Sequence, residues 1–209
     1  MIKFNFFYLV LAIFVFGFIS EKLLSLDILL MNSLAEQFTQ KQINDYFTLK
    51  NKWEWLSYIA VPILLFVKVA LIAAVLDLGC YISEKNIKYK KLFSIVVKAE
   101  FIFLSVIVFK TIWFYFFQTN HTLEDLQYFY PFSLLNIIGF EGLKPWFIYP
   151  LQVVNLFELT YWIFLAYLLD REFKTLKDQH TGIKIVSGSY GVGLLIWVVG
   201  VMFLTLNMS

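Results

Sequence analysis

Five long apolar runs, separated by short polar segments, dominate the chain. They cover residues 4–20, 55–82, 92–117, 150–169 and 185–206. About 20 helical residues cross a hydrocarbon core about 30 Å thick, so each run is long enough to span a bilayer. The pattern predicts an all-α, polytopic transmembrane helical bundle of about five spans, built as a single integral membrane domain over residues 1–209.

The first run resembles the apolar region of a signal peptide, since it follows a short start that contains Lys3. No small-x-small cleavage site precedes Glu21. We therefore interpret this run as a retained membrane helix.

Two further apolar segments lie outside the five runs. Residues 22–38 carry four leucines at spacings of three and four, which predicts an outer amphipathic helix. These are Leu23, Leu26, Leu30 and Leu34. Their stripe fits either the membrane surface or this protein's own helices. Residues 132–139 are apolar but too short to cross, so we expect a short interfacial or re-entrant segment there.

Basic residues in the connections favour one orientation. The connection between the second and third runs contains Lys85, Lys88, Lys90 and Lys91. The connection between the fourth and fifth runs contains Arg171, Lys174, Lys177 and Lys184. Basic connections stay on the cytoplasmic side during insertion, so we predict a cytoplasmic N-terminus and an outer C-terminus.

Composition agrees with a membrane protein and excludes one partner class. The chain is 60% hydrophobic and 15% charged, against about half and a quarter in soluble domains. A net charge of +2 and the lack of a basic face argue against nucleic acid. Of the 17 basic residues only Arg171 is arginine, which indicates an AT-biased, bacterial coding sequence and hence the inner (plasma) membrane.

Several polar side chains fall inside the apolar runs. A charge near the centre of a span costs about 2.5–3.5 kcal/mol on insertion scales, so each is a functional candidate that should have a partner. The candidates are Lys68, Asp77, Lys98, Glu100, Lys110, Gln152, Asn155 and Glu158.

Equal depth predicts two ion pairs, Asp77 with Lys98 and Glu158 with Lys110. Gln152, Asn155 and Glu158 also follow one another at spacings of three, which forms a polar stripe on the fourth run. Such a stripe either bonds neighbouring helices, lines a polar cavity, or relays protons.

The fifth run is rich in small residues. The candidate helix-packing positions are Ser187, Ser189, Gly191, Gly193 and Gly200. Small residues four apart allow two helix backbones to approach closely in lipid. The pattern predicts a tightly packed face, either within the protomer or toward a partner.

No familiar catalytic, cofactor or metal motif occurs. The two histidines, His121 and His180, are predicted on opposite sides of the membrane, and the single cysteine is Cys80. Metalloprotease, nucleophile-elbow and phosphate-loop motifs are missing. We therefore expect no enzyme, no cofactor and no metal.

The segment PLQVVNLFELTYW at 150–162 and the segment SYGVG at 189–193, with the order of spans, resemble the Yip family. That resemblance covers residues from about Trp55 onward, and the long segment 21–54 departs from it. It implies a small five-span protein that acts without catalysis by associating with other membrane components.

These observations predict a scaffold, assembly factor or accessory subunit of a membrane protein complex. Its partners would be the bilayer, other membrane proteins and, as one option, further copies of itself. The alternative is a transporter or channel component that uses Lys68, Lys110, Asn155 and Glu158 around a polar cavity. An intramembrane enzyme with an unfamiliar site comes third.

Overall fold

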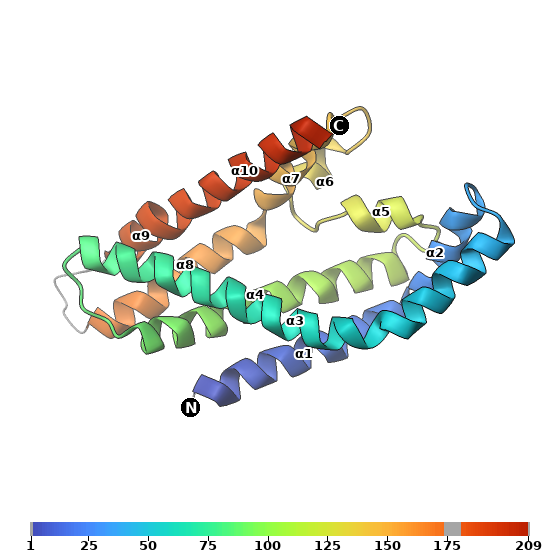
Figure 1. Cartoon of the computed structure of the whole chain (residues 1–209). Helices are drawn as coiled ribbons and strands as arrows, with labels where there is room; N and C mark the ends of the chain where they lie inside the picture. Colours follow the sequence, from blue (N-terminus) through green and yellow to red (C-terminus); the bar gives the residue numbers. More distant parts are fainter. Residues whose placement is uncertain (1, 174–180, 209) are drawn as a thin grey trace.

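The computed structural model describes residues 2–173 and 181–208, and all regular structure in these ranges is helical (Figure 1). This confirms the all-α prediction. The helices are α1 (Ile2–Leu23), α2 (Leu26–Ala35), α3 (Gln40–Ile82), α4 (Tyr89–Phe116), α5 (Leu123–Tyr128), α6 (Leu134–Ile138), α7 (Pro145–Val153), α8 (Leu156–Phe173), α9 (Thr181–Val186), the π-helix η1 (Ser187–Gly191) and α10 (Val192–Met208).

Within the described ranges, four helical stretches are long and apolar enough to cross a membrane. They are Phe6–Leu23, Gln40–Ile82, Tyr89–Phe116 and Thr181–Asn207. Four of the five predicted runs therefore lie on such helices, although α3 begins well before Trp55. The last stretch runs through α9, η1 and α10.

The predicted run 150–169 does not form one helix. The chain leaves the helical conformation at Val154, and α8 begins at Leu156. Asn155 fills the break, because its Oδ1 accepts a hydrogen bond from the backbone N–H of Glu158 at 2.8 Å. The prediction failed at this point because periodicity alone does not show where an asparagine caps a new helix. Since α8 also carries four charged residues, it is not one of the four long apolar helices.

The buried core lies where α3, α4, α8 and α9 meet. Helix α1 packs along α4, and α8 packs against both α4 and α9. Fully buried side chains at this junction include Leu76, Val96, Tyr161, Leu165 and Val186. The remaining faces of the long helices are covered with exposed apolar side chains, as expected for helices surrounded by lipid.

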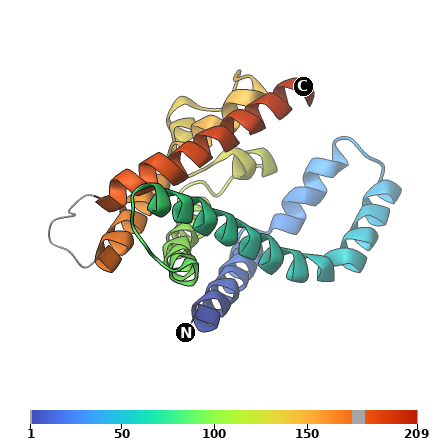
Figure 2. The ribbon, with the colours of Figure 1, turned by 60° about the vertical axis from the view of Figure 1, so that its left-hand side comes forward.

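Helix α3 is much longer than a bilayer is thick. Its 43 residues extend about 65 Å at 1.5 Å per residue, roughly twice the hydrocarbon core. A capping box of Thr39 and Gln42 fixes its start, and Figure 2 shows that the helix curves away from the other helices toward that start. The first part of α3 therefore extends beyond the long apolar segment.

Helix α2 and the first part of α3 form a helical hairpin, residues 26–55, which we call the projecting hairpin (Figure 2). No residue of α2 is buried, and Ile43 is the one buried residue between Gln40 and Trp55. Lys50 on α3 forms an ion pair with Asp27 on α2, which links the two arms.

The predicted amphipathic helix 22–38 has different ends. Ser25 adopts a left-handed conformation, so Lys22 and Leu23 belong to α1 and the second helix begins at Leu26. Leu26 and Leu29 pack on a small cluster of Leu24, Phe114 and Leu126. Part of the apolar stripe therefore contacts the protein's own helices.

The residues 132–139 contain a five-residue helix, α6. It ends at Gly139, whose φ of 88° suits glycine, and it packs on α7. The segment thus contains a short helix, and its interfacial or re-entrant placement stays a prediction.

The connection at 83–88 and the end of α8 lie at the same end of the bundle (Figure 1). Lys91 on α4 forms an ion pair with Glu172 on α8, with Nζ and Oε2 3.0 Å apart. Helix α9, which carries Lys184, packs on α8 and α3 at this end. The described basic residues of the two connections therefore lie at the same end of the bundle, whereas Lys174, Lys177 and His180 lie outside the described residues.

The Asp27–Lys50 ion pair generates a prediction about pH. Its hydrogen bond with Lys50 holds the pKa of Asp27 below the ordinary value of 3.8. The pair therefore stabilises the hairpin fully when the pH is above 3.8. This stabilisation is lost as the pH falls through the lowered pKa of Asp27. Between pH 5 and 8 the distance between spin labels on α2 and α3 should stay constant.

Between pH 5 and 8, Lys50→Met should broaden that distance distribution, because it removes the ion pair. The loss in hairpin stability should be less than about 1 kcal/mol, since both side chains are partly exposed. Lys52→Met, on the same exposed stretch, is the control and should change nothing. Equal broadening in both variants would contradict a role for the pair.

Candidate functional site

An ion pair joins α3 and α4. The ammonium of Lys68 is 2.7 Å from Oε2 of Glu100. Only 3% of the Glu100 side chain is exposed, against 47% for Lys68. The ammonium also lies 4.6 Å from the centroid of the Phe103 ring, a favourable cation–π distance. Lys68 therefore neutralises a deeply buried carboxylate from the edge of the bundle.

Helix α8 completes the contacts of that carboxylate. The hydroxyl of Tyr161 donates a hydrogen bond to Oε1 of Glu100 at 3.1 Å. Tyr161 is fully buried, and its ring packs on Phe103 with the centroids 5.0 Å apart. Each oxygen of Glu100 thus has one partner, from a different helix.

A second carboxyl group lies close to the first. Oε1 of Glu158 accepts hydrogen bonds from the indole Nε1 of Trp162 and from the hydroxyl of Tyr190, both at 2.8 Å. The rings of Tyr161 and Tyr190 pack with their centroids 5.4 Å apart. We call the six residues the polar cluster. It consists of Lys68, Glu100, Glu158, Tyr161, Trp162 and Tyr190.

Small residues of the last long helix allow the cluster to form. A Cβ on Gly191 would lie 2.5 Å from the Trp162 ring, so only glycine leaves room for the indole that binds Glu158. A Cβ on Gly79 of α3 would lie 2.6 Å from Oγ of Ser189. The π-helix η1 thus sits tightly between α3 and α8, and π-helical turns often occur at functional positions.

The helix-packing prediction is supported at three of its five positions. Ser189 and Gly191 make the close approaches just described, and the nearest atom to a Cβ on Gly193 is Val75 Cγ1 at 3.6 Å. Ser187 is exposed, and nothing lies within 4 Å of a Cβ on Gly200.

Both predicted ion pairs are wrong. Asp77 and Lys98 are not paired, and Lys98 is exposed. Lys110 donates to the backbone carbonyl of Leu126, while Glu158 is bound by aromatic donors. Equal depth did not predict the partners because rotation about each helix axis decides which side chains meet.

The predicted polar stripe separates into distinct roles. Asn155 is a helix cap, and its Nδ2 also donates to the carbonyls of Gln152 and Val153. The side chain of Gln152 reaches the carbonyl of Tyr128 at 3.5 Å. Of the three, only Glu158 belongs to the polar cluster, so the stripe mainly bonds neighbouring segments.

Sequence reasoning missed Tyr190 and Gly182. Tyr190 lies between Gly188 and Gly191 in the apolar run 185–206. The hydroxyl of a tyrosine in such a run can donate a hydrogen bond to a membrane carboxylate, so its role was detectable. Gly182 was not detectable. Its N–H donates to Asp170 at 2.7 Å, and a Cβ would lie 2.3 Å from the Ala166 carbonyl.

The cluster's geometry suits helix locking. Two clefts lie at the ends of the bundle, and no residue of the polar cluster lines either of them. Among the described residues, no group of three or more His, Cys, Asp or Glu side chains is placed to hold a metal. What the cluster provides is a set of hydrogen bonds that joins α3, α4, α8 and η1.

If the cluster locks the helices, Lys68→Met should destabilise the protein by about 3–5 kcal/mol, because it leaves the buried Glu100 carboxylate without a counter-charge. Adding Glu100→Gln removes that charge and keeps an acceptor for Tyr161, so the double variant should recover most of the loss. Thermal unfolding in detergent measures both. A double variant no more stable than Lys68→Met would contradict this role.

Gly191→Ala should cost about 1–3 kcal/mol, since the methyl group must displace the Trp162 ring. Gly200→Ala is the matched control on the same helix and should be neutral or slightly stabilising. Unfolding curves that coincide for the two variants would show that the Gly191 approach does not matter.

No family model matches the chain, and no curated protein or solved structure matches it either. The likeness to the Yip family therefore stays a prediction. The function has to be inferred from the polar cluster and from the surfaces that the bundle presents.

Proposed function

We propose that this protein is a non-enzymatic accessory factor that acts by holding other membrane proteins. The observation that carries the proposal is the projecting hairpin. Its arms bury only one side chain between Leu26–Ala35 and Gln40–Trp55, so most of its surface is free of intramolecular contacts. Apart from Leu26 and Leu29, which pack on the cluster of Leu24, Phe114 and Leu126, the hairpin presents a surface that a partner could cover.

The hairpin surface suits a protein partner near the outer headgroups. Apolar and aromatic side chains such as Tyr46, Leu49, Trp53 and Trp55 are about half exposed. Aromatic side chains are enriched both at membrane interfaces and at protein interfaces. Large, rigid side chains of this type are the usual anchors of a binding surface.

The polar cluster supports the same proposal. The charged side chains of the polar cluster are bonded to one another or to aromatic donors, and none of them lines either of the two clefts at the ends of the bundle. A stable bundle that presents a surface agrees with a scaffold better than with a path for solutes. The Yip-like segments predict the same class of function.

The proposed topology has five crossings in the inner membrane, with α7 and α8 together forming the fourth. Helix α8 packs between α4 and α9, and the end that carries Lys85, Lys91 and Lys184 would face the cytoplasm. The N-terminus would then be inside, and the hairpin and the C-terminus outside.

The proposal predicts that the full-length protein, purified from its native membrane in mild detergent, retains other membrane proteins that mass spectrometry identifies. Tyr46→Ala with Leu49→Ala on the hairpin should release them. Leu195→Ala with Phe203→Ala, which truncates equally exposed side chains on α10, is the matched control and should retain them.

Two outcomes would contradict the proposal. If the α10 variant released the partners while the hairpin variant retained them, the binding surface would lie on α10 and not on the hairpin. A protein that purifies alone, or only with copies of itself, would favour the alternative, a transporter or channel component.

One observation favours that alternative. Lys68 is nearly half exposed although its partner Glu100 is buried, so an ionisable pair lies at the edge of the bundle. If the pair served transport, Lys68→Met with Glu100→Gln would abolish solute flux in liposomes while the fold stayed intact.

A further inference from the structure

Three exposed basic side chains lie together on α4 and α8, at the end of the bundle opposite the hairpin. They are Lys91 and Lys98 on α4 and Arg171 on α8. Lys91 and Lys98 are seven residues apart, which is nearly two turns, so they share one face of α4. Arg171 directly precedes Glu172, which pairs with Lys91, so it lies at the level of Lys91. We call these three residues the basic patch.

The basic patch points away from the core. Lys98 precedes Glu100 by two residues, which is about 200° around α4, and Glu100 faces α3 through its pair with Lys68. Lys98 therefore faces away from α3. On α8, Arg171 is exposed, whereas the preceding Asp170 contacts α9. The side that carries the patch is thus open to the surroundings of the bundle.

The cations of the patch have few partners in the protein. Lys98 forms no hydrogen bond or ion pair within the described chain. Cζ of Arg171 lies 5.8 Å from the centroid of the Tyr167 ring, but no acid that the structure describes pairs with its guanidinium. Lys91 is paired, yet 56% of its side chain stays exposed. The patch therefore carries three positive charges beside the one negative charge of Glu172.

Ser94 adds a free hydroxyl to the same face. It follows Lys91 by three residues and precedes Lys98 by four. Further along α4, the hydroxyls of Ser105 and Thr111 donate to carbonyls of their own helix. Ser94 makes no hydrogen bond with any described residue. Its donor is thus left for an acceptor outside the protein.

The depth of Lys98 indicates where that acceptor lies. Helix α4 has 28 residues, and about 20 of them fill the hydrocarbon core. With α4 centred in the bilayer, about four residues remain outside at each end, so Lys98 lies roughly 8 Å inside the boundary. A lysine side chain extends back to such a boundary. The nearest anions there are the phosphates of lipid headgroups.

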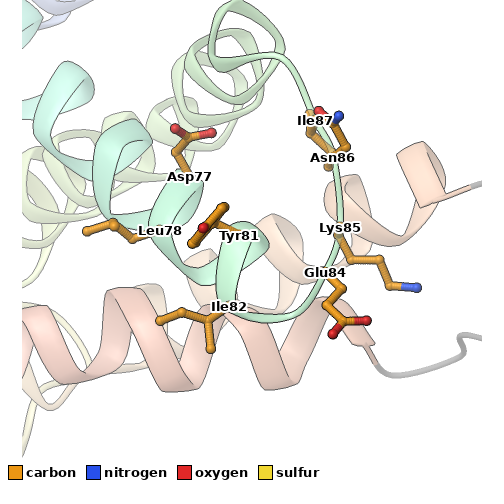
Figure 3. Close-up of a pocket in the computed structure, with 8 residues that line it drawn as sticks. All are labelled: Asp77, Leu78, Tyr81, Ile82, Glu84, Lys85, Asn86 and Ile87. Atoms are coloured by element: carbon orange, nitrogen blue, oxygen red, sulfur yellow. The ribbon is translucent and has the colours of Figure 1, made fainter.

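The unpaired acids at this end of the bundle lie elsewhere. Figure 3 shows Asp77 and Glu84 on a cleft of about 740 Å³ between the last turns of α3 and the connection to α4. No residue of the basic patch lines that cleft, and neither acid forms an ion pair with the patch. The charge of the patch is therefore not neutralised from this side.

We propose that the basic patch binds an anionic phospholipid, of the phosphatidylglycerol class. The lipid phosphate accepts hydrogen bonds from Lys98, Ser94 and Arg171, and the guanidinium offers two parallel N–H groups. The acyl chains lie along the exposed rings of Phe101 and Phe109 on α4. A choline headgroup brings a positive charge that the patch repels. The site is separate from the hairpin and does not depend on the function proposed above.

The test uses the full-length protein in mild detergent with equal amounts of phosphatidylglycerol and phosphatidylcholine, followed by native mass spectrometry of the retained lipid. Phosphatidylglycerol should be retained about twentyfold over phosphatidylcholine, since each basic residue near an anionic lipid contributes about fivefold. Lys98→Gln and Arg171→Gln should each lower the preference to about fourfold. Lys184→Gln is the control and should keep it, because it removes the same charge from an exposed position of α9.

Equal retention of the two lipids by the wild-type protein would overturn the proposal. An equal loss of preference in Lys184→Gln would assign the effect to net charge and overturn the patch. Lys98→Arg keeps the charge, so it has to keep the preference; a loss in both Lys98 variants would overturn the role of this cation. Displacement of the lipid by inorganic phosphate at similar concentration would assign a soluble anion and overturn the lipid.

Discussion

The Glu100 carboxylate is the group on which the arrangement of the bundle depends. It is almost completely buried on α4, where an ionised group without partners would cost several kcal/mol. Lys68 from α3 and Tyr161 from α8 each bind one of its oxygens. Because the two oxygens of Glu100 bind residues of α3 and α8, these two helices must lie beside α4. The same contacts limit the rotation of each helix about its own axis.

The rest of the core follows from this requirement. Tyr161 packs on Tyr190, Tyr190 binds Glu158, and Glu158 holds the Trp162 indole. The indole needs the space that Gly191 leaves. Lipid supplies no hydrophobic force that drives helices together, so such hydrogen bonds and close backbone contacts determine which helices associate.

Much of the fold was predictable because a helix that crosses a bilayer needs about 20 predominantly apolar residues. Runs of apolar residues predicted the four long helices, whereas the cytoplasmic side assigned to the basic connections stays a prediction. The partners of Lys68 and Glu158 were not predictable, because depth along a helix follows from residue count whereas the direction of a side chain follows from packing. Asn155 shows the same limit: a polar residue in an apolar run looked like part of a stripe, but its side chain caps a helix.

The π-helix η1 carries one more residue per turn than the helices on either side of it. Residues before and after it are therefore out of phase by about 100° relative to an unbroken α-helix. That offset lets α9 direct Gly182 toward α8 while Tyr190 and Gly191 also face α8 about two turns later. A chain lacking one residue of Ser187–Gly191 would keep its apolar length, but it could no longer present both contacts to the same neighbour.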